Sequence, residues 1–162
     1  MKDKSPAERL DSARYLFLRE LHEPTKGALR LVVQEAVSGP PVGGKALRVL
    51  PKNLRKLFGA RHLTRPIVSD DSCFSYEIVW PSYISYSVRD EDFATVDKAE
   101  KYKGRFLRRY SRSNYLDYLS NATYAEFFSK GQFSHWGVVT LTRIVDVASV
   151  EAPAVRRFKS YD

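Results

Sequence analysis

The sequence has one cysteine, Cys73, in 162 residues. A single cysteine can form neither an internal disulfide nor a thiolate-rich metal site, which fits a reducing compartment. No apolar run approaches the roughly 18 residues that a membrane span needs, and residues 1–14 hold no apolar signal region. We therefore expect a cytoplasmic protein with no membrane partner.

Motifs for catalysis and for cofactors are also scarce. The histidines His22, His62 and His135 lie far apart, without the H-x-x-x-H or C-x-x-C spacing of a local metal site. Residues 39–45 spell most of a phosphate-binding P-loop, but Ala46 stands where a magnesium-binding Ser or Thr is needed. No G-x-S-x-G nucleophile motif is present. We assign no catalytic residue, cofactor or metal ligand, and enzymatic activity stays an open alternative.

The composition is that of an ordinary globular domain. Apolar residues make up 43% of the chain, aromatic residues 13% and charged residues 28%, and a chain of this length usually folds around one core. The Pro- and Gly-rich stretch 38–44 is too short for a domain linker. We expect a single domain over residues 1–162, in which residues 153–162 form a frayed basic tail.

The net charge of +8 is divided into blocks along the chain. Residues 45–65 carry seven basic side chains and no acid, whereas residues 66–97 carry seven acids and only Arg89 as a base. Residues 98–112 are basic again, with seven cations against Glu100. Such blocks create local potentials that steer charged partners, unless they pair with one another within the fold.

Hydrophobic spacing indicates two helices. Ser5, Pro6 and Glu8 form a capping box with proline at the first helical position, and an apolar stripe continues to Leu21, so the first helix should end near residues 23–24. Ser113 caps a second helix near residues 113–129. Together with the strands described next, this order predicts an α+β fold with a mostly antiparallel sheet and both helices packed on one face.

The strongest strand signal covers residues 75–89. Tyr76, Trp80 and the other even positions to Val88 are mostly apolar, while the odd positions are mostly polar, so one face should be core. Pro81 has no N–H to donate, which predicts a bulge, a hairpin or an edge position. Weaker patterns predict further strands and one short basic helix; these are strands at 29–37, 46–50, 105–110 and 136–147 and a helix at 51–58.

Cations and aromatic residues alternate over residues 101–112, the combination that binds phosphates and stacks bases. A nucleic-acid-binding module is therefore one alternative for the function. Its phosphate contacts would be six basic side chains: Lys52, Arg55, Lys56, Arg105, Arg108 and Arg109. A hydrolase or nuclease that uses Glu77, His135 and Asp146 as acid–base groups is a third alternative.

Three stretches resemble a family of small, uncharacterised bacterial proteins. They are FSYEIVWPSYISYSVRDEDFA (residues 74–94), RYSRSNYLDYL (109–119) and HWGVVTLTRIVDVAS (135–149). The family brings no established activity and therefore no site residue; the resemblance implies a bacterial, cytoplasmic protein of accessory type. Such proteins are often immunity or antitoxin proteins, which is an analogy.

We therefore expect a non-enzymatic protein-binding domain, of a bacterial immunity or antitoxin type, that occludes a partner toxin. Tyrosine is abundant, with 10 residues, and tyrosine and arginine are favoured at protein interfaces. The predicted contact surface consists of six residues: Tyr83, Arg89, Arg108, Arg109, Tyr110 and Arg112.

Overall fold

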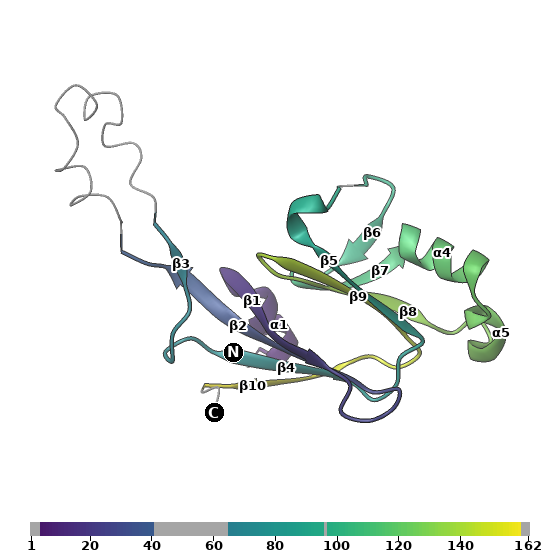
Figure 1. Ribbon diagram of the computed structural model, residues 1–162, viewed down its shortest axis with the longest axis horizontal. Helices are drawn as coiled ribbons and strands as arrows, with labels where there is room; N and C mark the ends of the chain where they lie inside the picture. The colour runs from purple at the N-terminus through teal and green to yellow at the C-terminus, as the bar shows by residue number, and fades with distance from the viewer. Residues whose placement is uncertain (1–3, 41–64, 96, 160–162) are drawn as a thin grey trace, which may run out of the picture.

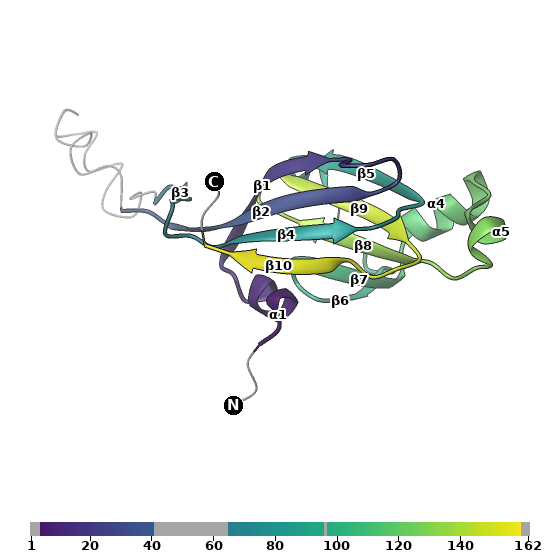
Figure 2. The ribbon, with the colours of Figure 1, turned by 90° about the horizontal axis from the view of Figure 1, so that it is seen from below.

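The computed structural model describes residues 4–40, 65–95 and 97–159. Two antiparallel sheets, each of five strands, form two layers (Figures 1 and 2). The first sheet has the order β1-β2-β4-β10, with β3 paired to β2, and the second has the order β5-β9-β8-β7-β6. The strands of the first sheet are β1 Tyr15–His22, β2 Leu29–Ser38, β3 Ile67–Val68, β4 Ser75–Trp80 and β10 Ala154–Phe158. Those of the second are β5 Ser85–Asp90, β6 Lys101–Lys103, β7 Leu107–Arg112, β8 Ser134–Val139 and β9 Arg143–Ser149.

Four short helical elements accompany the sheets in the described residues. They are α1 Pro6–Asp11, the 3₁₀ turn η2 Glu91–Phe93, α4 Asn114–Ala122 and α5 Ala125–Ser129. α1 contacts β10 of the first sheet and β7 of the second, and α4 packs against β8 (Figure 2). The α+β fold with antiparallel sheets, an N-terminal helix and a later helix is as predicted. No helix in the described part of the chain is long and apolar enough to cross a membrane.

The hydrophobic core lies between the two sheets. Strand alternation turns one face of each strand inward, so Leu31 on β2, Ile78 on β4 and Val145 on β9 are fully buried. Burying a large apolar side chain contributes about 1.5–3 kcal/mol. Both sheets contribute such residues, so the core holds the second sheet in place by its inner face. Its outer face can therefore carry polar side chains.

The N-terminal helix is shorter than predicted. The capping box is confirmed, since Ser5 Oγ accepts the Glu8 N–H and the Glu8 carboxylate accepts the Ser5 N–H. The helix nevertheless ends at Asp11, and residues 15–22 form β1, so the prediction of a helix to residues 23–24 is wrong. The apolar positions of this segment fit a helix and a strand equally well. Hydrogen bonding to the long strand β2 selects the strand.

The strand predicted over residues 75–89 is two strands in different sheets. β4 ends at Trp80, directly before Pro81, and β5 begins at Ser85, so the chain crosses from the first sheet to the second. The missing N–H of the proline explains why the ladder stops there. Alternation holds in β4, where Tyr76 and Trp80 are fully buried, but Val88 on β5 is 47% exposed.

Three further predictions need correction. The segment 136–147 is a hairpin, because Thr140 closes a tight turn by bonding both the N–H and the C=O of Arg143. The second helix, capped by Ser113 as predicted, breaks at Thr123 into α4 and α5. The frayed tail predicted for residues 153–162 is wrong over β10, which pairs with residues 75–79 of β4. The strand predicted at 46–50 and the helix at 51–58 lie outside the described residues.

One carboxylate joins α1 to the second sheet. Asp11, the last residue of α1, accepts the backbone N–H groups of Arg105, Phe106 and Leu107 at distances of 2.8–3.1 Å. Gly104 precedes them with a φ of +90°, and a Cβ there would lie 2.1 Å from the Leu107 carbonyl oxygen. Only glycine fits this turn, which brings the three donors to Asp11.

Candidate functional site

The outer face of the second sheet carries the polar side chains that the core face excludes. Ser87 on β5 is paired with Asp146 on β9, and Asp146 is also paired with Gly137 on β8. In antiparallel sheets paired residues point to the same face, and residues two apart along a strand do so as well. Arg89 and His135 therefore share the outer face with Ser87 and Asp146.

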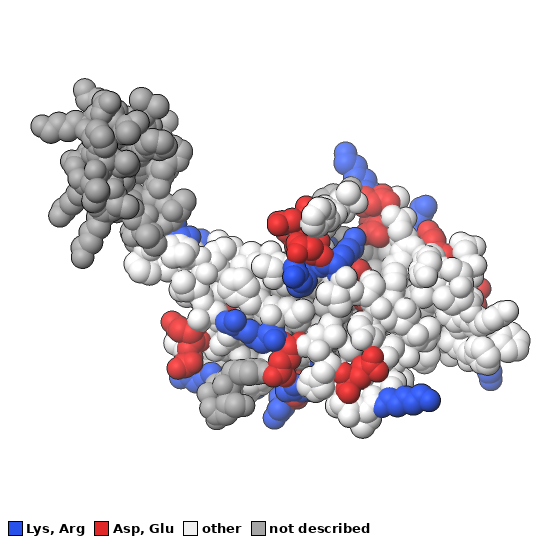
Figure 3. Space-filling view, viewed as in Figure 1, with Lys and Arg blue, Asp and Glu red and all other residues white. Residues whose placement is uncertain are grey.

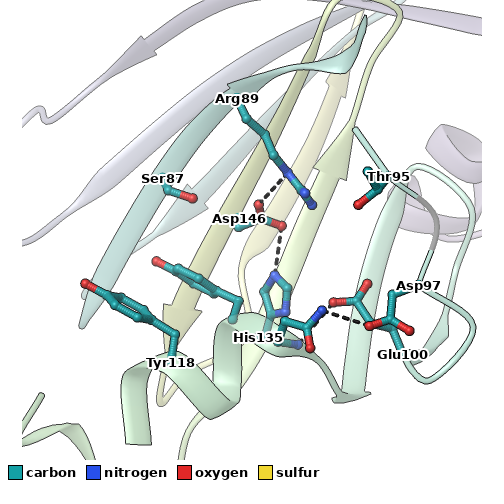
Figure 4. A pocket seen from close by; sticks show the side chains of 10 residues that line it. Ser87, Arg89, Thr95, Asp97, Glu100, Tyr118, His135 and Asp146 are labelled. Atoms are coloured by element: carbon teal, nitrogen blue, oxygen red, sulfur yellow. Dashed lines mark hydrogen bonds and ion pairs between the residues drawn. The ribbon is translucent and has the colours of Figure 1, made fainter. Parts of the chain in front are cut away.

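A hollow of about 280 Å³ opens on this face, and we call it the polar cleft (Figure 4). α4 forms one wall and Thr95, Asp97 and Glu100 form another, while β5, β8 and β9 form the floor. The lining residues are Ser87, Arg89, Thr95, Asp97, Glu100, Asn114, Tyr115, Tyr118, His135 and Asp146.

A chain of polar contacts runs beneath the cleft and ends at Arg89. Ser113 Oγ lies 2.8 Å from His135 Nδ1, and His135 Nε2 lies 3.0 Å from Asp146 Oδ1. Asp146 Oδ2 in turn lies 3.2 Å from Arg89 Nε, as an ion pair. Ser113, His135 and Asp146 are between 1% and 4% exposed. We call these four residues the arginine-positioning chain.

The hydrogen-bond directions in this chain follow from the Asp146 carboxylate, which can only accept and so takes a proton from His135 Nε2, and from the cap of α4. Ser113 Oγ accepts the N–H of Leu116, so its own proton is available to His135 Nδ1. A neutral imidazole that accepts at Nδ1 carries its proton at Nε2 and donates it to Asp146. This assignment satisfies every partner in the chain. The Ser–His–Asp order resembles a nucleophilic triad, but the serine oxygen is buried and engaged as a helix cap, so no substrate can reach it.

Aromatic packing fixes the histidine. Tyr110 stacks on His135 with ring centroids 4.1 Å apart and planes 10° apart, and Tyr115 covers another side at 5.0 Å. Gly137 makes the stacking feasible, since a Cβ there would lie 2.9 Å from the Tyr110 ring. Burial raises the pKa of Tyr110 and of Tyr115 above the ordinary phenol value, so both hydroxyls stay protonated at neutral pH.

Opposite charges face one another across the cleft. The Arg89 side chain is 45% exposed, and its terminal nitrogens have no hydrogen-bond partner among residues 4–40, 65–95 and 97–159. Figure 4 shows Asp97 and Glu100 on the other side of the hollow. The backbone N–H of Ala99 and the Asn114 amide hold the pKa of Asp97 below its usual range, so this carboxylate stays charged. The cleft is therefore dipolar.

An exposed aromatic cluster adjoins the cleft at α5. Tyr124, Phe127 and Phe128, which we call the aromatic tip, are between 77% and 79% exposed. In Figure 3 this end of the molecule is largely free of charged side chains, whereas acidic side chains gather over η2. Beside the tip lies an apolar groove of about 340 Å³. The groove is lined by Ile84, Ser85, Thr123, Tyr124, Ala125, Phe128, Ser129 and Val150.

One hydrogen bond links the cleft and the apolar groove. The Tyr115 hydroxyl, on the α4 wall of the cleft, donates to Ser85 Oγ at 3.0 Å, and Ser85 also lines the groove. Tyr118, which is 58% exposed, lines the cleft one helical turn before α4 ends. The polar cleft, the groove and the aromatic tip thus form one continuous surface around α4 and α5.

Three of the six residues predicted for the contact surface lie at this site. Arg89 lines the cleft, and Arg108 and Tyr110 line an adjoining hollow that shares Arg89 with it. Tyr83 instead packs edge-on against Tyr86, with ring centroids 5.1 Å apart, at the margin of the core. Arg112 lies at the end of β7, where its backbone pairs with β6.

Among the described residues, the basic side chains predicted to bind phosphates do not form one surface. Arg105 donates to the carbonyl oxygens of Ala13 and Arg14, and Arg108 lies 4.4 Å from the centre of the Tyr102 ring. Arg109 points to the opposite face of β7 from Arg108, over the Trp136 ring. The three remaining residues, Lys52, Arg55 and Lys56, lie outside the described residues.

The acid–base set proposed for a hydrolase is divided between the sheets. His135 and Asp146 are bonded to one another on the second sheet, as described above. Glu77 lies on β4 of the first sheet, where Arg30 and Arg156 hold its two carboxylate oxygens at 2.6 and 3.0 Å. Among the described residues, no group of His, Cys, Asp or Glu side chains is arranged to hold a metal ion.

Sequence reasoning missed much of the cleft. Ser113 was recognised only as a helix cap, and Asp97, Asn114 and Tyr115 carried no motif. The signal that could have found part of it is the hairpin 134–149. Once its turn is placed at Thr140, the register puts the side chains of His135 and Asp146 on the same face.

Comparison with known proteins adds no relative. No family model, no curated protein and no solved structure matches the chain.

Proposed function

We propose that the protein is a non-enzymatic binding protein that holds a partner protein on the surface formed by the aromatic tip, the apolar groove and the polar cleft. The observation that carries this proposal is the exposure of Tyr124, Phe127 and Phe128, at 77–79% each. Monomeric proteins rarely leave such apolar clusters in water, and those that do use them for contacts. Aromatic side chains are also the commonest anchors of protein interfaces.

The fold itself gives no reason for phenylalanine at the tip. α5 buries only Ala125, and the two phenylalanines touch each other edge to face, with ring centroids 5.2 Å apart. Neither belongs to the core cluster between the sheets. Their apolar surface contributes little to folding, so a contact outside the chain is what explains it.

The polar cleft supplies the specificity of this contact. Arg89 offers donors at one side, while Asp97 and Glu100 offer acceptors at the other. A partner group that fits between them must accept hydrogen bonds at one end and donate at the other, as a peptide unit, an amide side chain or a pair of opposite charges does. A loop of a partner protein supplies such groups, with an apolar side chain for the adjacent groove.

The other two functions find less support in the described residues. A hydrolase would need an accessible nucleophile or an acid–base pair open to substrate, but Ser113 and His135 are each 1% exposed. A nucleic-acid module would need a continuous track of cations with stacking platforms. Arg105 and Arg109 are instead occupied by contacts within the protein.

The net charge bears on the class of partner. A charge of +8 attracts acidic proteins over a distance and speeds their encounter. We therefore propose an acidic partner that presents an apolar anchor to the groove. That this partner is a bacterial toxin, which the resemblance of about residues 74–155 suggests, stays a prediction.

Site-specific photo-cross-linking in the native host tests the proposal. Benzoylphenylalanine is placed at Phe127 in the tip, or at Val68 on β3 at the far end of the molecule as a control. We expect one protein to be cross-linked from position 127 and not from 68. Adducts only with nucleic acid, only with a second copy of this chain, or equally from both positions would contradict the proposal.

A matched pair of charge variants tests the role of the cleft in the same experiment. Arg89→Gln should lower the yield of the adduct about tenfold, because it removes a charged donor from the interface. Arg143→Gln is the control, since Arg143 has the same 45% side-chain exposure but pairs with Asp90 outside the cleft. Equal yields from the two variants would show that the cleft does not take part.

A further inference from the structure

Another hollow lies at the edge of the core, beside α1. It measures about 310 Å³ and is lined by four cations, Lys4, Arg9, Arg14 and Arg157, and by a single acid, Glu35. We call it the basic pocket. It shares no residue with the polar cleft or the apolar groove.

Three cations of the basic pocket, Lys4, Arg14 and Arg157, have no ion-pair partner in the described chain. The carboxylate of Glu35 accepts the hydroxyl of Tyr76 at 2.6 Å. Because Lys4, Arg14 and Arg157 have no ion-pair partner among the described residues, an anion in the pocket would reduce their mutual repulsion and stabilise the fold.

Arg157 gives the most specific sign of a missing partner. Its guanidinium carbon lies 3.3 Å from the centre of the Phe74 ring, which fixes the plane of the group. Its Nε is buried and has no hydrogen-bond partner in the described chain. A buried donor without an acceptor costs about 1–3 kcal/mol, and more when it belongs to a charged group. An anion that binds the same guanidinium from the pocket would offset part of that cost.

The other wall of the pocket is held in place before any ligand binds. Arg105 donates to the carbonyl oxygens of Ala13 and Arg14 at 2.9 and 3.3 Å, which anchors the turn between α1 and β1. Lys4 Nζ donates to Ser12 Oγ at 3.2 Å on the α1 side. A backbone that is already anchored need not be ordered when a ligand binds, so this geometry favours binding.

We propose that the basic pocket binds a phosphate group, as inorganic phosphate or as the monoester of a small molecule. Phosphate carries up to two negative charges and several acceptor oxygens, and arginine matches its geometry with two donors. A volume of about 310 Å³ admits the phosphate and a small attached group. α1 and the core bound the pocket, so it offers no continuous path for a polymer backbone.

Titration at constant ionic strength tests this assignment. Inorganic phosphate and glycerol 3-phosphate are the probes, and a single-stranded oligonucleotide is the polymer arm. We expect saturable binding of both small probes by calorimetry, with a shift of the Arg157 Nε–H signal in ¹H–¹⁵N spectra. No binding of either small probe, or binding of the oligonucleotide alone, would overturn the proposal.

Two variants separate the pocket from general charge effects. Arg14→Gln, at an exposed position of the wall, should weaken phosphate binding about tenfold by removing one charge-assisted donor. Lys26→Gln removes the same charge in the β1–β2 connection and should leave the affinity unchanged. Equal losses in both variants would mean that phosphate only screens the net charge, and would overturn the assignment. Arg89→Gln in the polar cleft should have no effect on phosphate binding.

Discussion

At the scale of single residues, the account depends on how Arg89 is held. An isolated surface arginine samples many rotamers, and ordering it on binding costs free energy. Here Asp146 fixes its Nε, and His135 and Ser113 fix Asp146. A binding group that is ordered in advance gives a tighter and more selective contact than the same group on a flexible stem.

Glu77 gives a prediction for stability against pH. Arg30, held at 2.6 Å, is the main reason that the pKa of Glu77 lies below its ordinary value of 4.5. A lowered pKa in the folded state means that the charged carboxylate stabilises the fold. This contribution is complete above pH 4.5 and is lost as the pH falls through the lower folded value.

Glu77→Gln should therefore destabilise the protein by about 1–3 kcal/mol at pH 7, since it leaves the partly buried Arg30 without a full partner. Arg156 adds little, because its side chain is 71% exposed. Urea unfolding at pH 7 and pH 3 measures the effect. We expect the difference between the two proteins to shrink at pH 3; a difference independent of pH would contradict this assignment.

At the scale of elements, the contact between α1 and the 104–107 turn is the sharpest case. Asp11→Ala would leave three backbone N–H groups without their acceptor, and we expect a loss of about 2–4 kcal/mol in the free energy of unfolding. Asp71→Ala is the control, because Asp71 is an exposed acid that makes no hydrogen bond with this turn. Denaturant titration of both variants gives the values, and equal effects would show that the Asp11 contacts are weak.

Local signals in the sequence predicted elements well where one residue decides the geometry. Ser5 and Ser113 were recognised as helix caps because capping needs only a hydroxyl and the next turn of chain. Pro81 was recognised as an interruption because it lacks a donor. Residues 15–22 were misread, since the pairing of β1 with β2 depends on contacts that lie 8 to 21 positions away along the chain.

The candidate site was less accessible to sequence reasoning than the fold. Arg89, Arg108 and Tyr110 were chosen for residue type, and they do meet at the second sheet. The strand order β5-β9-β8-β7-β6 brings them together, and local sequence patterns do not predict a strand order. Asp97, the negative charge that faces Arg89 in the cleft, lies in a connection whose sequence has no hydrophobic periodicity.

At the scale of the whole molecule, the two proposed sites lie on different elements around one shared core. The first sheet and α1 carry the basic pocket, while the second sheet and α4 carry the polar cleft, the apolar groove and the aromatic tip (Figure 1). Both sheets pack against the same core, so a ligand that stabilises one sheet also stabilises the sheet that carries the other site. The two sites share no lining residue, so the proposals predict that a partner protein and a phosphate bind at the same time.

Hydrogen–deuterium exchange on the complex with the cross-linked partner tests the central claim most directly. If the partner docks as proposed, amides of α4, α5 and β5, over residues 114–129 and 85–90, should exchange more slowly in the complex than in the free protein. Amides of β1 and the β1–β2 connection should not change. Slower exchange confined to the first sheet or α1, with none at α4 and α5, would contradict the account.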